Sequence, residues 1–387
     1  MKTYSPFSLW IILVSATLTV MAGSIIAPVL NLMREELGAD PVSAAIIITT
    51  HGIFIALCSP LIGILIDRGG AKRPFVLGLL LYGLAGASGL FITSYWVLII
   101  SRIFLGVAVA AIYTSITVLI LNLYDGVERN KVMGWRGSSN SFGGIIWTLL
   151  GGVLGRLSWH LPFAAYLVGI PLGFMALFAV PEAHQENIQD PKGESKTSSV
   201  LQIFKDVPIL FVIYGLVFLL NILLYAIVVF LPQLLEKIDI SNPFHIGLFI
   251  SIAPLSGGLT SLRYGKLRER LSYKMIILIA LALWSIGFIA IFQGSYIWLI
   301  APSIALFGIG LGMVMPASMV WVGESVPVSF RGRISSYLGT FGFVGQFFSP
   351  IIFRPVVLSL GINSVFLAAG VGCAFLFFLS LIFIRKI

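Results

Sequence analysis

The sequence predicts an all-α polytopic membrane protein with twelve transmembrane helices. Of its 387 residues, 58% are hydrophobic and only 10% are charged, whereas a soluble domain carries about 25% charged residues. The mean hydropathy is +1.04. The apolar residues fall in long runs, and a run of about 20 residues crosses the hydrocarbon core as a helix. Open strands are excluded because lipid leaves their backbone polar groups without partners.

Twelve runs are long enough to span the membrane. Their predicted limits are 8–33, 43–66, 75–93, 95–123, 132–155, 161–180, 207–234, 245–264, 274–293, 296–322, 333–359 and 363–384. Prolines within several of them, including Pro28, Pro171 and Pro350, predict kinks.

The longest polar segment divides the runs into two groups of six. We predict an N-terminal six-helix bundle at residues 1–180, a cytoplasmic linker at 181–206 with a short surface helix near Val200–Lys205, and a C-terminal six-helix bundle at 207–387. The linker composition is typical of a tether.

The distribution of basic residues predicts the orientation. Most of the 24 lysines and arginines fall in the loops on the side of the termini; the other side holds only Arg34, Arg156, Lys237 and Arg354. Since basic loops stay in the cytoplasm, we expect both termini there and a location in a prokaryotic inner or plasma membrane. This bias also accounts for the net charge of +9 without a nucleic-acid partner.

The two halves of the chain are related by an offset of 202 residues. Asp67 corresponds to Glu269 and Gly106 to Gly308, and Trp96 corresponds to Trp298. Two parallel six-helix repeats are the plan of a secondary transporter with a midplane site. Arg102 corresponds to Ile304, so one buried charge is present in only one half. Such asymmetry marks a place for specific chemistry.

Two motifs resemble those of the major facilitator superfamily. Residues 63–73 follow the pattern G-x-x-x-D-R-x-G-x-K-R, which is similar to the loop between the second and third helices of that family. Residues 102–106 resemble its R-x-x-x-G motif on the fourth helix. Within that family, the chain resembles the drug/proton antiporter-like (arabinose-efflux-permease-like) members. The resemblance implies rocker-switch alternating access between two halves.

The resemblance also implies two gating segments. We call Gly63–Arg73 the first latch and its repeat, Gly265–Lys274, the second latch. Asp67 is expected to meet the start of the eleventh helix near Arg333–Ser336, and Glu269 the start of the fifth near Lys131–Gly134, because a helix N-terminus attracts a carboxylate. The predicted gating residues are Gly63, Asp67, Arg68, Gly70, Lys72, Arg73, Gly265, Glu269, Arg270, Lys274, Arg331 and Arg333.

The fifth helix departs from the antiporter pattern. Antiporters of this family usually carry a Gly-Pro pair there, but this chain has Trp147-Thr148 between flanking glycines. The departure puts the antiport direction in question.

Ionisable and polar side chains within the spans are candidates for a substrate or proton pathway. Arg102 either faces a cavity and binds an anion or tunes a proton site, or it has a structural role, in which it hydrogen-bonds backbone carbonyls or holds the fourth helix against the first or second. His51 either exchanges protons or packs as a neutral side chain. The full candidate set is Arg102, His51, Tyr113, Asn140, Trp147, Asn221, Tyr225 and Gln346.

The sequence predicts a transporter of a small organic solute, with efflux as the first choice. No acidic residue lies near the middle of any span, so coupling uses unusual proton groups, another ion or none. Uptake or facilitated transport of an anionic or neutral metabolite is the alternative, and a non-transporting sensor or scaffold is a third class. No nucleotide-binding loop or metal-ligand motif occurs. We therefore expect no cofactor and no enzyme, and a monomer in contact with lipid.

Overall fold

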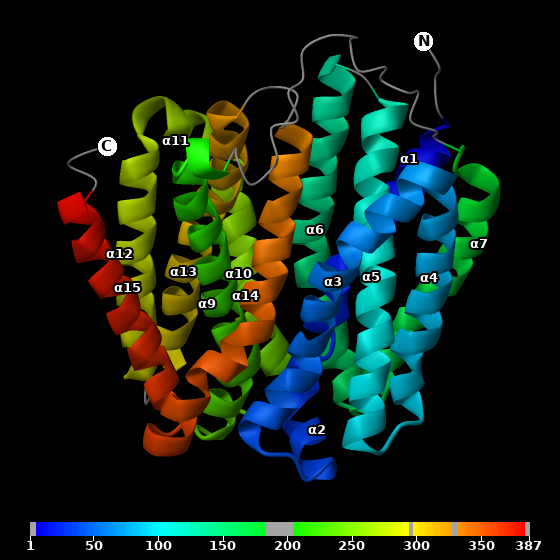
Figure 1. Ribbon diagram of the computed structural model, residues 1–387. Helices are drawn as coiled ribbons and strands as arrows, with labels where there is room; N and C mark the ends of the chain where they lie inside the picture. The colour runs from blue at the N-terminus through cyan, green and yellow to red at the C-terminus, as the bar shows by residue number, and fades with distance from the viewer. Residues whose placement is uncertain (1–4, 125, 183–203, 294–296, 327–330, 384–387) are drawn as a thin grey trace. The chain divides into compact units, whose positions relative to one another are not determined.

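The computed structural model of the chain (Figure 1) describes residues 5–124, 126–182, 204–293, 297–326 and 331–383. Every regular element within these ranges is a helix, which confirms the predicted all-α class.

Residue contacts divide the chain into two compact units. The first contains residues 1–39 and 47–198, and the second contains residues 40–46 and 199–387. The first six residues of the helix that begins at Pro41 therefore group with the second unit. Most of the linker predicted at 181–206 lies outside the described residues, apart from a helical turn at Phe204–Asp206. The division at that linker stays a prediction.

The first unit is a helix bundle. Its long helices are α1 (Pro6–Ser24), most of α3 (Pro41–Gly69), α4 (Lys72–Ala87), α5 (Tyr95–Leu123), α6 (Gly126–Gly155) and α7 (Gly169–Ala179), joined by η1 (Ala27–Val29), α2 (Leu30–Glu36), η2 (Ser88–Leu90) and η3 (Leu161–Val168). Helix α4 packs against α5 and α7, as the right-hand side of Figure 1 shows, and α1 packs along α6.

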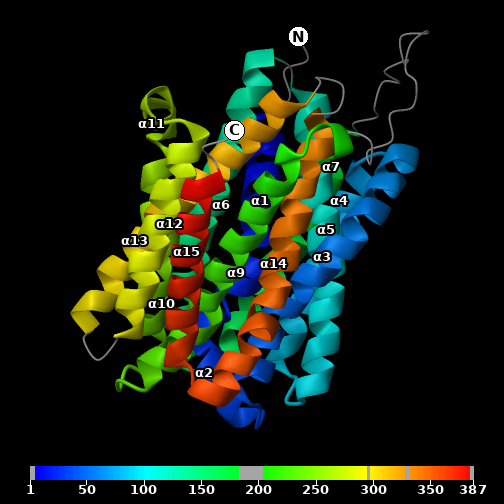
Figure 2. The same ribbon diagram turned by 60° about the vertical axis from the view of Figure 1, so that its left-hand side comes forward.

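The second unit repeats this plan. It consists of α9 (Ile209–Glu236), α10 (Pro243–Ser261), α11 (Tyr264–Arg270), α12 (Tyr273–Phe292), α13 (Ile297–Ser325), α14 (Arg331–Leu360) and α15 (Asn363–Phe383). Helix α12 packs against α13 and α15 (Figure 2), and α9 packs along α14. Each of these pairs has its counterpart in the first unit.

The helix boundaries follow the 202-residue offset found in the sequence. Helix α13 begins and ends 202 residues after α5, and α10 begins 202 residues after α3. At the starts of α3 and α10, an acidic or amide side chain directly precedes a proline. Asp40 Oδ1 accepts the backbone N–H of Val42 at 2.9 Å, and Asn242 Oδ1 accepts that of Phe244 at 3.0 Å. Both are N-caps that the sequence pattern specifies locally.

Eleven helical stretches in the described part of the chain are long and apolar enough to span a membrane, if adjoining α and 3-10 segments are taken together. Each corresponds to a predicted span. The remaining predicted span, 132–155, lies within α6, which has 30 residues but a polar N-terminal half.

Two predicted spans are interrupted. The run at 8–33 is not one helix, because α1 ends at Ser24 and a 3-10 turn containing Pro28 precedes α2. The run at 161–180 begins as the 3-10 helix η3 and becomes α-helical only at Gly169. Proline removes a backbone donor and disfavours the α conformation of the preceding residue, which accounts for the break at Pro28.

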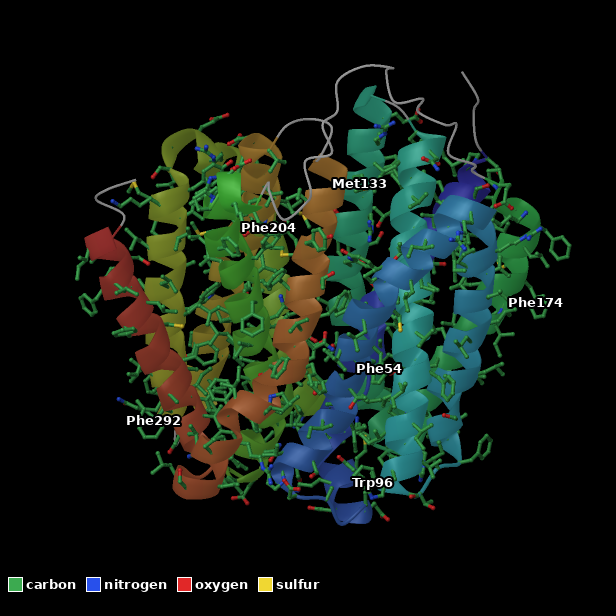
Figure 3. The ribbon with its side chains drawn as sticks, in the orientation of Figure 1. Phe54, Trp96, Met133, Phe174, Phe204 and Phe292 are labelled. Atoms are coloured by element: carbon green, nitrogen blue, oxygen red, sulfur yellow. The ribbon has the colours of Figure 1, made fainter. Side chains whose placement is uncertain are left out.

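Large apolar side chains point outward from the bundles. Figure 3 shows Trp96 near one end of α5 and Phe174 on α7, and they are 72% and 54% exposed. Trp298, the repeat counterpart of Trp96, is 68% exposed. Tryptophans at helix ends are typical of the membrane–water interface.

Glycines allow equivalent helix contacts in both units. A Cβ built on Gly106 would lie 2.6 Å from the carbonyl oxygen of His51, so α5 approaches the backbone of α3 directly. In the second unit Gly308 of α13 lies in the same way against the carbonyl of Ala253 on α10. Ala253 follows His51 by 202 residues. Small residues allow this close packing where lipid provides no hydrophobic driving force between helices.

Gly106→Ala should lower the free energy of unfolding by about 1–3 kcal/mol, since the added methyl group overpacks the α3–α5 contact. Gly137→Ala on α6 is the matched control, because no atom lies within 4 Å of its added Cβ. It should leave stability unchanged or raise it by up to about 1 kcal/mol. Thermal unfolding in detergent measures both, and equal melting temperatures would contradict the contact.

Candidate functional site

Arg102 on α5 is a fully buried cation in the first unit. Its Nη2 donates to the carbonyl oxygen of Gly86 at 3.2 Å, its Nη1 to the hydroxyl of Tyr166 at 3.5 Å, and its Nε to that of Ser101 at 3.3 Å. The guanidinium carbon also lies 5.1 Å and 5.4 Å from the ring centroids of Phe163 and Tyr166. Hydroxyl, carbonyl and aromatic groups together replace the water that this charge would otherwise hold.

Arg102 and the side chains around it form a cluster, here called the Arg102 cluster, which two tyrosines extend to α1. Tyr166 of η3 donates to the carbonyl oxygen of Ala22 at 2.8 Å. Tyr82 of α4 donates to that of Leu18 at 2.9 Å, and the two tyrosine rings lie 5.3 Å apart. The cluster therefore joins four helical segments of one unit.

His51 lies on α3, next to the Arg102 cluster. Its side chain is buried, and the two groups interact electrostatically. Its backbone carbonyl contacts Gly106. The structure thus brings His51 and Arg102 together, and their predicted roles in a proton or substrate pathway stay predictions.

A second buried cation, Arg136, was not among the predicted pathway residues. It lies on α6, and its Nη1 donates to the hydroxyl of Thr117 at 2.8 Å. Its guanidinium carbon lies 4.7 Å from the ring centroid of the predicted residue Tyr113. The sequence signal that could have found it is the polar run 136–141 inside a predicted span.

Asn140 and Trp147 follow Arg136 along α6. Asn140 is half-buried, and its Oδ1 has no hydrogen-bond partner among the described residues. The indole N–H of Trp147 donates to the hydroxyl of Thr17 on α1 at 3.0 Å. Beside this bond an open groove of about 310 Å³ runs between α1 and α6; its lining includes Trp10 and Phe142.

The predicted pathway residues of the second unit lie on two packed helices. Asn221 and Tyr225 lie on α9, and Gln346 lies on α14. Asn221 is half-buried and donates to the carbonyl oxygen of Val217 at 2.9 Å. A Cβ built on Gly342 of α14 would lie 3.0 Å from the side-chain nitrogen of Asn221, so Asn221 faces α14.

The first latch is mostly helical. Helix α3 continues through Gly69 and α4 begins at Lys72, so the turn is limited to Gly70 and Ala71. Gly70 has a φ of +82°, which favours glycine, and the carboxylate of Glu182 lies against it. Arg68 and Arg73 are exposed. The side chain of Asp67 lies outside the described set, as do those of Arg331 and Arg333.

The second latch contains the short helix α11. Glu269 and Arg270 are exposed, while Arg268, which was not predicted, lies over the ring of Tyr273 at 4.0 Å. The hydroxyl of Tyr273 donates to Glu324 of α13 at 2.7 Å. Hydrogen bonding to Tyr273 raises the pKa of Arg268. These contacts hold α11 against α12 and α13, whereas the predicted gate contacts of both latches stay predictions.

The part of the chain that the structure describes contains no cluster of His, Cys, Asp or Glu suited to a metal ion. The buried arginines and the hydroxyl groups beside them offer recognition by charge and hydrogen bonding.

Tyr166→Phe should lower the free energy of unfolding by about 1–3 kcal/mol, because it removes a partner of Arg102 and of a buried carbonyl together. Tyr82→Phe removes one bond to a neutral carbonyl and should cost less, about 0.5–1.5 kcal/mol. Chemical denaturation of the purified proteins compares them. A Tyr166→Phe protein as stable as the wild type would contradict the role of the cluster in holding the helices.

The sequence matches the family model of the Major Facilitator Superfamily over residues 12–270 and 237–386. The bacillibactin exporter of Bacillus subtilis (strain 168) is 24% identical over 348 residues, covering 87% of this chain and 86% of that protein. The class B tetracycline resistance protein of Escherichia coli is 28% identical over 214 residues, which cover 53% of each chain.

Solved structures show the same fold. One is a bacterial homologue of the human lysosomal transporter Spinster, in an inward-facing and occupied conformation. It superposes with a TM-score of 0.80 at 15% identity, and the match covers 98% of this chain and 97% of that one. The predicted family and fold are confirmed. The chain belongs to the Major Facilitator Superfamily and is a multi-pass integral membrane transporter.

Proposed function

We propose that this transporter exports a small organic solute by alternating access. The observation that carries the direction is the similarity to a protein named bacillibactin exporter, over 87% of this chain. The similarity to a tetracycline resistance protein supports the same direction. Two units with the same order of helices also suit a mechanism in which a midplane site is opened to each side in turn. The latches then close the cytoplasmic end.

The N-terminal unit supplies most of the candidate chemistry. Arg102, His51 and Arg136 bring two fixed positive charges and one titratable group into its helices. No ion pair joins either arginine to a carboxylate among the described residues. This arrangement suits a neutral or anionic solute better than a lipophilic cation, which needs a carboxylate as its counter-ion.

In the first version of the proposal, export is driven by proton exchange. His51 is the candidate carrier, because a histidine changes its charge between about pH 5 and 8. Coupling to another ion, or to none, is the other version.

Uptake or facilitated movement of a metabolite is the second candidate function. It is favoured by Trp147, which occupies the place of the glycine in the antiporter Gly-Pro pair and bonds α6 to α1 through Thr17. That bond tethers the helix where the antiporter pattern would bend it.

Transport is tested with purified protein in liposomes. Solutes that raise its melting temperature, with tetracycline and salicylate included in the panel, are assayed for counterflow and then for flux driven by an imposed pH gradient. We expect counterflow of at least one stabilising solute, with accumulation on the acidic side if protons are exchanged. Binding without counterflow would overturn transport and favour a sensor. Flux insensitive to both pH and membrane potential would overturn the antiporter version.

His51→Gln should flatten the pH dependence of flux, because an amide does not titrate where imidazole does. His245→Gln is the control, since His245 is an exposed histidine on α10, and it should keep the wild-type profile. Initial rates between about pH 5 and 8 measure the effect. A wild-type profile in the His51→Gln protein would remove His51 from the coupling.

A further inference from the structure

Arg136 uses only part of its hydrogen-bonding capacity within the first unit. A guanidinium has five N–H donors in a planar fork. Nη1 donates to Thr117, and Nη2 makes a 3.5 Å contact with the carbonyl oxygen of Tyr113. Nε donates to none of the residues that the structure describes. One edge of the fork is therefore free to take an oxyanion.

The contrast with Arg102 is direct. All three nitrogens of Arg102 donate to protein groups, two aromatic rings cover it, and it is 0% exposed. Arg136 has one ring against it and is 9% exposed. Arg102 is thus closed in by the bundle, whereas Arg136 keeps an accessible edge.

The internal repeat provides a control for the structural role of Arg136. The position 202 residues later is Leu338, which lies in an apolar cluster with Val217 and Val322. Tyr113 and Thr117, the contacts of Arg136, correspond to Met315 and Met319. The same helix pair packs in the second unit without any of these polar groups. The helix bundle therefore does not need the charge, which costs free energy to bury in a membrane.

A second polar group lies beside Arg136. Asn140 is one helical turn further along α6, and residues four apart share a face, with Cβ atoms roughly 6 Å from each other. Its Oδ1 is buried and has no partner among the described residues. The oxygen of such an amide can accept a hydrogen bond from a hydroxyl group. If the amide group rotates by half a turn, its NH2 can instead donate to an anion. In the second unit the corresponding residue is Gly342.

We propose that Arg136 and Asn140 form an anion-recognition site for a solute that carries a carboxylate with a neighbouring hydroxyl group. The carboxylate accepts from the free edge of Arg136, where a charge-assisted bond is strong, and the hydroxyl meets Asn140. This inference rests on the proposed transport function and names the class of its substrate. A purely structural clamp between α5 and α6 is the competing reading.

Salicylate and its neutral carboxamide, salicylamide, are the matched probes. Binding is measured as the rise in melting temperature of the full-length protein in detergent at constant ionic strength, because a ligand of the folded state raises apparent stability. We expect salicylate to bind at least about tenfold more tightly than salicylamide. Equal responses to the two probes, or no response to salicylate, would overturn the proposal.

Arg136→Gln should remove the preference for salicylate. Arg156→Gln makes the same change of charge at an exposed position between α6 and η3 and should keep the preference. If Arg136→Gln does not fold, the Arg136→Lys variant tests the site instead. It keeps the charge without the planar fork, so a reduced but persistent preference is expected. An unchanged preference in either Arg136 variant that folds would overturn the site.

Flux separates this inference from the proposed function. Counterflow of tetracycline by a protein that shows no preference for salicylate overturns the anion site and leaves transport standing. A preference for salicylate that depends on Arg136, without flux of salicylate or tetracycline, supports the anion site and overturns transport. Salicylate flux that Arg136→Gln abolishes and Arg156→Gln retains supports both.

Discussion

The hydrocarbon core of a membrane offers no hydrogen bonds, and most of this structure follows from that constraint. Backbone groups are satisfied within helices, and hydroxyls bond back to carbonyls of their own helix, as Thr148 does to Gly144 at 2.6 Å. Helices then approach one another where glycines allow it, with Gly106 and Gly308 at equivalent contacts. A charged side chain in such a bundle must be enclosed by protein groups or must face something other than lipid.

Arg102 and Arg136 of the first unit are enclosed to different degrees. Arg102 is enclosed by hydroxyls, a carbonyl and two rings that come from α4, α5 and η3. Of the two interpretations considered for Arg102, these contacts agree with the one in which it holds helices together. Arg136 is less completely enclosed, which makes it the better candidate for contact with a solute.

Because the two halves of the chain share one fold, each is a control for the other. Positions that are polar in the first unit and apolar in the second cannot be requirements of the shared packing. Arg136 against Leu338 and Asn140 against Gly342 belong to this group. Family membership defines the fold, and the proposed recognition site lies where the two halves differ.

The sequence alone determined the helical class, the spans and the repeat, because hydrophobic runs are local properties. The N-caps at Asp40 and Asn242 are also local, although the predicted spans began at residues 43 and 245. It predicted a kink at Pro28, but not the division of that run into α1 and α2, the 3-10 geometry of η3 or the helical character of the latches. Tertiary structure decided the state of each buried charge, because the partners come from other helices: Tyr166 lies 64 residues from Arg102, and Thr117 lies 19 from Arg136. Whether a cation is closed in or open depends on which side chains the neighbouring helices bring to it, and no local pattern encodes that.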